Sequence, residues 1–129
     1  MAGLMLSSER LFLGIGALSA GISVAAGAFG AHALVGLVTT ERIAVWETAA
    51  RYQMYHALAL MIVAYLASQK AAGPVRIGGW LFVVGTLIFS GSLYTLVLTD
   101  IRWLGAITPI GGTAFIGGWL ALAWGVWRR

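Results

Sequence analysis

Four apolar stretches, each about as long as a membrane crossing, occupy nearly all of the 129 residues. A helix needs about 20 mainly apolar residues to span the hydrocarbon core of a bilayer, and the stretches meet that length at approximately 11–31, 41–68, 75–98 and 109–127. Charged residues make up only 9% of the chain, whereas a soluble domain carries about 25%. The sequence therefore predicts an all-α fold, a transmembrane four-helix bundle that forms one integral membrane domain over residues 1–129.

Small residues recur at intervals of seven within every stretch. In lipid the hydrophobic effect cannot drive helices together, so helices associate where small residues let their backbones approach closely. We therefore predict that the helices pack through these positions. They are Gly14, Gly21 and Ala28 in the first stretch; Ala50, Ala57 and Ala64 in the second; Gly78, Gly85 and Ser92 in the third; and Gly111, Gly118 and Gly125 in the fourth.

The basic residues stand singly near the ends of the stretches and do not form a patch, although the net charge is +4. This distribution is typical of a topology signal and excludes a phosphate-binding face for nucleic acid. With four crossings, one side of the membrane carries Arg10, Lys70, Arg76, Arg128 and Arg129, and the other carries Arg42, Arg51 and Arg102. Because the side richer in Lys and Arg faces the cytoplasm, we predict a multi-pass protein of the bacterial cytoplasmic membrane with both termini in the cytoplasm.

Two helix starts can be predicted from capping residues. Thr40, followed by Glu41 in the first turn, is the expected N-cap of the second helix. Thr108 and Pro109 are typical of an N-cap and a first helical position, so residues 103–107 would form a separate interfacial segment before the fourth helix. The alternative is one longer helix that is kinked at Pro109.

Polar side chains inside the predicted spans are few, which makes each a candidate for function. Tyr52, Gln53 and His56 share a helix face through i,i+3 and i,i+4 spacing, and Gln53 adjoins the small residues at 50 and 57, so this face should point into the bundle. The first helix runs outward and the second inward, which places the candidates together in the outer leaflet. They form either a hydrogen-bond network that fixes helix register or a polar pocket for a ligand, ion or proton. The candidate polar cluster is His32, Tyr52, Gln53, His56, Ser90, Ser92, Tyr94 and Thr108.

No metal or cofactor site is predicted. The chain has no cysteine and two histidines. His56 lies about 24 Å along the second helix, whereas His32 lies at the outer end of the first, so the two imidazoles could not ligate one heme iron. Two histidines without nearby carboxylates cannot complete a zinc site. Nor can an acid, a base and a nucleophile be brought together, so we predict no catalytic residues.

Several short motifs, in order along the chain, resemble the DUF423 family of small four-helix membrane proteins of unknown function, which occurs in bacteria and in organisms with mitochondria. The motifs are Gly27-Ala28-Phe29-Gly30-Ala31-His32; Trp46, Tyr52-Gln53 and His56-Ala57-Leu58-Ala59; Phe89-Ser90-Gly91-Ser92-Leu93-Tyr94; and Thr108-Pro109-Ile110-Gly111-Gly112 with Gly118-Trp119. Ala33 departs from the family pattern, which usually has glycine there. The resemblance implies an integral membrane protein with four helices and carries no established activity.

The sequence thus predicts a non-enzymatic membrane protein that acts through helix packing. It would be an accessory subunit of a larger complex or a small oligomeric scaffold, and its partners would be membrane lipids and other membrane subunits or identical copies, with no nucleic acid. The alternative is a small transporter or channel-like protein that uses the polar cluster of the outer leaflet.

Overall fold

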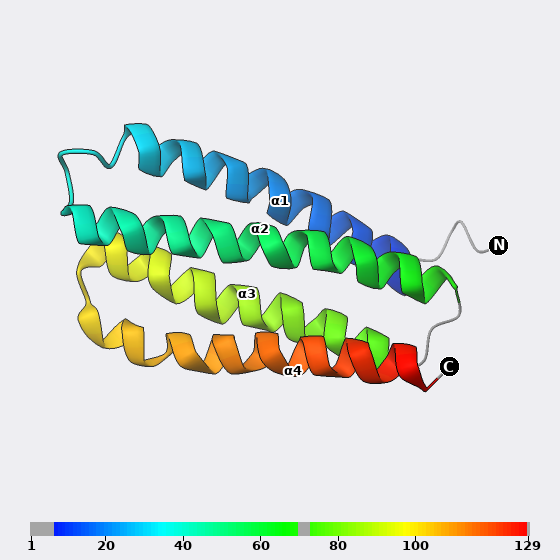
Figure 1. The fold of residues 1–129 in the computed structure, drawn as a ribbon. Helices are drawn as coiled ribbons and strands as arrows, with labels where there is room; N and C mark the ends of the chain where they lie inside the picture. The colour runs from blue at the N-terminus through cyan, green and yellow to red at the C-terminus, as the bar shows by residue number, and fades with distance from the viewer. Residues whose placement is uncertain (1–6, 70–72, 129) are drawn as a thin grey trace.

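In the part of the chain that the structure describes, four long helices follow one another (Figure 1). The structure is a computed structural model, and it describes residues 7–69 and 73–128. The helices are α1 (Ser8–His32), α2 (Thr40–Ser68), α3 (Gly73–Thr99) and α4 (Thr108–Trp127), and a short 3-10 helix, η2 (Arg102–Ala106), precedes α4. Each begins within about three residues of the predicted start, so the all-α bundle is confirmed.

The helices form a row in which each packs mainly on its neighbours in the chain. The extensive contacts join α1 to α2, α2 to α3, and α3 to α4, and Figure 1 shows α1 and α4 at the two edges of the row. Near the start of α1, Phe12 also reaches α3, where its ring meets Trp80 with a centroid distance of 5.1 Å. In this row α2 has a helix on each side. In contrast, α1 has a helix on one side only, so its opposite face is not covered by the described residues.

Among the described residues, three helical segments are long and apolar enough to cross a membrane: α1, α3 and the segment Arg102–Trp127. The helix outside this set is α2, which contains the predicted polar residues Tyr52, Gln53 and His56. Because α2 runs antiparallel between α1 and α3 over most of their length, it lies at the same depth as they do. Gln53 and His56 are buried against the neighbouring helices, which compensates for the lower hydropathy of α2.

The helix ends differ in detail from the predicted caps. Thr39, and not Thr40, is the N-cap of α2, because its hydroxyl accepts a hydrogen bond from the N–H of Arg42 at 3.2 Å. Pro109 lies in the first turn of α4, and the separate η2 segment before it confirms the predicted break there. Thr108 does not cap α4, since the N-cap position is Ile107 and no side chain bonds there.

Small residues pack α2, α3 and α4 together as predicted. Ala50, Ala57 and Ala64 are buried along α2. Between α3 and α4, the backbones come so close that a Cβ added at Gly78 would lie 2.8 Å from the carbonyl oxygen of Gly118. A Cβ added at Gly85 or at Gly118 would crowd a phenylalanine ring of the facing helix. A Cβ added at Gly125 would crowd the Val75 side chain.

On α1 the predicted packing residues are wrong. Gly14, Gly21 and Ala28 face away from the bundle, and a Cβ added at either glycine would meet nothing within 4 Å. The small residues that α1 buries are instead three others at the same interval of seven: Gly16, Ser23 and Gly30. A shift of two residues rotates a helix face by about 200°, so the predicted face points to the opposite side.

Candidate functional site

The predicted polar residues do not form one cluster. The structure divides them into a group around Gln53, a group around His56, a pair between α3 and α4, and one residue, His32, that belongs to none of these. The groups lie along both flanks of α2 and on the α3–α4 contact. The arrangement therefore corrects the prediction of a single shared pocket.

Gln53 connects three helices. Its side-chain N–H₂ donates to the backbone oxygen and the hydroxyl of Ser19 on α1, both at 3.2 Å. Its carbonyl oxygen accepts from the hydroxyl of Tyr94 on α3 at 2.7 Å. Gln53 is only 6% exposed, so the prediction that it points inward is confirmed. Because the amide is bonded at both ends, it fixes the register of α1 and α3 against α2.

Two serines and a tryptophan bind backbone carbonyl oxygens on neighbouring helices. Ser90 on α3 donates to Ala49 on α2, and Ser23 on α1 donates to Ala50, each at 2.7 Å. Trp46 donates its indole N–H to Ala26 on α1, also at 2.7 Å. Sequence reasoning missed Ser19, Ser23 and this use of Trp46. The signal for Ser23 was its place midway in the second series of small residues on α1.

His56 lies on the flank of α2 that faces α4. Its Nδ1 is 2.7 Å from the backbone oxygen of Tyr52, and its Nε2 is 3.1 Å from the indole Nε1 of Trp119. Because the indole can only donate, Nε2 accepts, and the proton of a neutral imidazole is on Nδ1. The ring stacks on Phe115 with centroids 3.5 Å apart and an interplanar angle of 5°. Both ring nitrogens thus have protein partners, and sequence reasoning did not foresee Trp119 as one of them.

The remaining candidates are a pair and an outlier. The hydroxyls of Ser92 on α3 and Thr108 on α4 lie 2.6 Å apart, and Thr108 also donates to the backbone oxygen of Leu104 at 3.4 Å. Thr108 therefore joins α3 to the start of α4. His32 is the last residue of α1, is exposed and makes no hydrogen bond to the described residues. Its inclusion in the polar cluster was wrong, because the helix ends before the side chain can reach the other groups.

The α1–α2 connection lies at one end of the bundle. At that end the structure shows a group of charged residues that was not predicted. The Arg42 guanidinium donates to the backbone oxygen of Val97, near the end of α3. Arg42 and Arg102 lie 3.9 Å and 3.7 Å from the same Asp100 carboxylate oxygen, and Asp100 has a φ of 57°. These contacts hold the first turn of α2 against the last turn of α3. Their partners come from three different segments, so no local sequence pattern indicates them.

A groove along the membrane-spanning part of the bundle lies between α2 and α4, and we call it the α2–α4 groove. It has a volume of about 470 Å³. Its lining is mainly aromatic, and His56 lies at its inner wall. The lining residues are Tyr52, His56, Phe89, Pro109, Gly112, Thr113, Phe115, Ile116 and Trp119.

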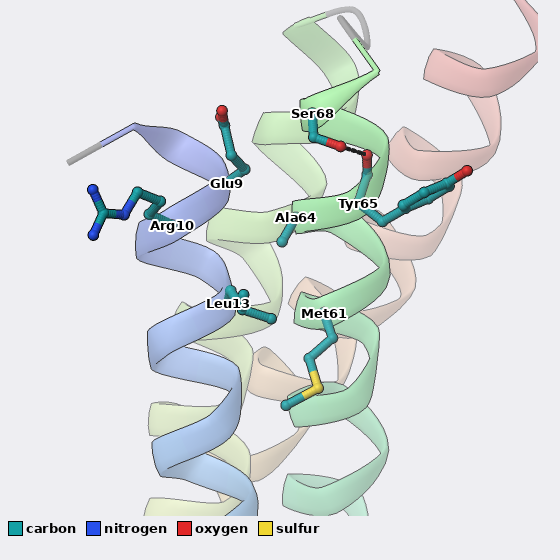
Figure 2. A pocket seen from close by; sticks show the side chains of 7 residues that line it. All are labelled: Glu9, Arg10, Leu13, Met61, Ala64, Tyr65 and Ser68. Atoms are coloured by element: carbon teal, nitrogen blue, oxygen red, sulfur yellow. Dashed lines mark hydrogen bonds between the residues drawn. The ribbon is translucent and has the colours of Figure 1, made fainter. Parts of the chain in front are cut away.

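A second groove lies between the start of α1 and the end of α2 and has a volume of about 300 Å³ (Figure 2). Leu13, Met61 and Ala64 form its apolar part. The Ser68 hydroxyl donates to the backbone oxygen of Tyr65 at 2.6 Å, and Figure 2 shows the Arg10 guanidinium pointing away from α2.

Over residues 7–69 and 73–128, no three His, Cys, Asp or Glu side chains come close enough to hold a metal ion. Six of the predicted polar side chains instead bond to one another, to backbone oxygens or to an indole N–H group: Gln53, His56, Ser90, Ser92, Tyr94 and Thr108. In this part of the chain the polar contacts hold neighbouring helices together, and the α2–α4 groove presents aromatic side chains to the bilayer.

Comparisons with known proteins agree with this architecture. Residues 26–112 match the profile of a family described as protein of unknown function, DUF423. A UPF0382 membrane protein of Staphylococcus aureus is 50% identical over 113 residues, which cover 88% of this chain and 92% of the relative. The UPF0382 membrane protein YwdK of Bacillus subtilis is 47% identical over 114 residues, covering 88% of this chain and 93% of the relative. No solved structure matches the chain.

Proposed function

The chain belongs to the DUF423 family of proteins of unknown function, and we propose that it acts there as a non-enzymatic scaffold of the bacterial cytoplasmic membrane, a homodimer joined through α1. The observation that carries this proposal is the uncovered face of α1. Small residues follow it at intervals of seven, as Gly14, Gly21 and Ala28, with open space above the two glycines. We call this surface the α1 outer face.

The physical argument rests on what glycine does in a lipid-facing helix. Each glycine costs about 1 kcal/mol of helix stability relative to alanine, and a glycine that faces only lipid has no compensating contact. A second helix laid on such a face would approach closely and gain dispersion contacts. A flat row of small residues is complementary to itself, so two copies can meet through the same face around a two-fold axis. An identical chain is therefore the partner that we propose.

The other assignment from the sequence, transport, receives less support from the geometry. A transport path requires polar groups that are free to bind a moving solute or proton. Gln53, Ser90 and Ser92 are instead bonded to protein groups, and His56 has partners at both nitrogens. These contacts support a role for the polar residues in fixing helix positions.

The dimer can be tested by disulfide cross-linking, because the chain contains no cysteine. Gly21→Cys is expected to form disulfide-linked dimers in native membranes on mild oxidation, since the two-fold axis would bring the two thiols together. Gly27→Cys is the matched control: an added Cβ there also meets nothing within 4 Å, but the residue lies about 120° away around the helix from the α1 outer face. Cross-linking at 27 that equals cross-linking at 21 would contradict the proposed face.

A second arm separates a homodimer from other assemblies. The double variant Gly14→Leu, Gly21→Leu is expected to raise the dimer dissociation constant in detergent at least tenfold, because the larger side chains keep the helices apart. Gly27→Leu should not change it. A wild-type protein that is monomeric in nanodiscs would refute the homodimer, and so would one that co-purifies in fixed ratio with a different membrane protein.

The proposed orientation places both termini in the cytoplasm, as the distribution of Lys and Arg favours. Leu37 lies in the connection between α1 and α2 and is 76% exposed, and Ser68 ends α2 at the opposite end of the bundle. In spheroplasts, a membrane-impermeant maleimide is expected to label Leu37→Cys directly and Ser68→Cys only after permeabilisation. The reverse pattern would show the opposite orientation.

A further inference from the structure

The α2–α4 groove has continuous aromatic walls. Tyr52 contacts Phe89 with ring centroids 5.0 Å apart, and Phe89 contacts Phe115 at 5.3 Å. Phe115 in turn stacks on His56, whose ring lies 5.8 Å from that of Trp119. The rings come from α2, α3 and α4, so three helices hold them in place. A volume of about 470 Å³ falls within the roughly 300–1,000 Å³ of small-molecule sites.

Aromatic walls favour a planar, conjugated ligand over a flexible acyl chain. Rings bind other rings through offset stacking and edge-to-face contacts, which add about 0.5–1.5 kcal/mol per pair beyond the area buried. A saturated acyl chain gains the area term alone. The walls therefore select for a flat ring system that can enter sideways from the bilayer.

The polar groups of the groove further restrict which ligand would bind. The Trp119 N–H is taken by His56, and the Thr113 hydroxyl donates to the backbone oxygen of Pro109 at 2.8 Å. The Tyr52 side chain is 38% exposed, and its hydroxyl has no hydrogen-bond partner among the described residues. A hydroxyl without a hydrogen-bond partner within a bilayer is costly. Tyr52 thus offers a free donor beside the aromatic walls, and an acyl chain has no acceptor for it.

We infer that the α2–α4 groove binds a quinone-type molecule of the bilayer, with its planar ring against the aromatic walls and one ring carbonyl accepting a hydrogen bond from Tyr52. The hydrophobic tail of such a molecule would leave the groove toward lipid past Ile116, which is 64% exposed. The inference concerns binding alone and includes no electron transfer. It does not depend on the α1 dimer, because the groove lies at the other edge of the row.

Binding can be measured with the full-length protein in nanodiscs of phosphatidylethanolamine and phosphatidylglycerol. An azido derivative of a short-chain ubiquinone is the photo-reactive probe, and mass spectrometry identifies the labelled peptides. Labelling is expected in the segments around Tyr52 and from Gly112 to Trp119, and excess decylubiquinone should suppress it. Labelling confined to other segments would overturn the inference.

Affinity for decylubiquinone separates the hydrogen bond from simple partitioning. Tyr52→Phe is expected to weaken binding about fivefold, the equivalent of one neutral hydrogen bond. Tyr55→Phe, one turn along α2 and outside the groove, should not change it. Equal affinity of Tyr52→Phe and wild type would refute the role of the hydroxyl.

Filling the groove provides a second test that does not depend on Tyr52. The nearest atoms to a Cβ added at Gly112 belong to the Phe89 ring at 3.9 Å, so Gly112→Leu should fold and occupy the groove. We expect it to reduce quinone affinity more than tenfold. Gly91→Leu, on α3 outside the groove with open space around the added Cβ, is the matched control. The inference fails if Gly112→Leu binds as wild type does, or if decanol competes as well as decylubiquinone, which would identify a site for acyl chains.

Discussion

Gly111→Ala is expected to lower the free energy of unfolding by about 1–3 kcal/mol, the usual cost of overpacking a well-packed contact. At this position α4 lies directly against the backbone of α3. An added Cβ would overlap the backbone nitrogen of Phe89 and lie 2.8 Å from its Cα. Backbone atoms of a helix cannot rotate away as a side chain can, so α3 and α4 would have to separate along their whole contact.

The neighbouring glycine provides the control for this prediction. Gly112→Ala makes the same chemical change one residue later, where the nearest atoms are 3.9 Å from the added Cβ. Both variants gain up to about 1 kcal/mol of helix propensity, so their difference reports the contact alone. Thermal unfolding in dodecylmaltoside, followed by circular dichroism, should give a clearly lower Tm for Gly111→Ala. Equal Tm values for the two variants would show that α3 and α4 are not in contact at this point.

Gln53→Leu is expected to have the second-largest effect, a loss of about 1–2 kcal/mol. The substitution removes the hydrogen bonds to Ser19 and Tyr94 and leaves their polar atoms without partners in the interior. Hydrogen bonds between membrane helices contribute on average about 0.6 kcal/mol each and at most about 1.7, so two or three of them give this range. The loss should appear as early separation of α1 from α2.

A double-mutant cycle with Tyr94→Phe isolates the pair. If the Tyr94 hydroxyl bonds to Gln53, the two substitutions together should cost less than the sum of their separate effects, with a coupling of about 0.6–1.7 kcal/mol. Thr95→Val is a suitable control, because that hydroxyl bonds only to Gly91 within its own helix. Strict additivity of Gln53→Leu and Tyr94→Phe would rule out the bond.

The helices and their approximate ends could be predicted because they depend on local properties. Apolar length fixes the spans, and the proline at 109 fixes where α4 begins, after a separate η2. The N-cap of α2 was placed one residue late because Thr39 and Thr40 are equally good capping residues by type. Only the bond from the Arg42 N–H distinguishes them.

The buried face of α1 could not be predicted, for a geometrical reason. The helix carries two series of small residues, one beginning at Gly14 and the other at Gly16, and both repeat every seven residues. Periodicity alone gives them equal weight. The choice depends on α2, which presents the Ala50 oxygen to Ser23 and the Trp46 ring to Gly30. These partners lie more than fifteen residues away in the sequence.

Only part of the candidate site could be predicted, for a similar reason. Gln53 could be directed inward because it lies beside small residues on its own helix. Its separation from His56 could not be foreseen, since Ser19 and Tyr94 belong to α1 and α3, whereas Trp119 belongs to α4. Three residues of spacing along α2 are enough to direct the two side chains toward different neighbours. Spacing on one helix therefore indicates which side chains are internal, without identifying their partners.

The place of α2 in the row has a consequence for how the protein is made. As a nascent segment, α2 is less apolar than the helices on either side and would leave the translocation machinery with an unbonded Gln53 amide and with the Nε2 of His56 unbonded. Its bonds to Ser19 on α1 form with a segment that has already been synthesised, whereas those to Tyr94 and Trp119 await the second half of the chain. We therefore expect α2 to enter the membrane as a hairpin with α1, and its hydrogen bonds to be complete only when α4 has been synthesised.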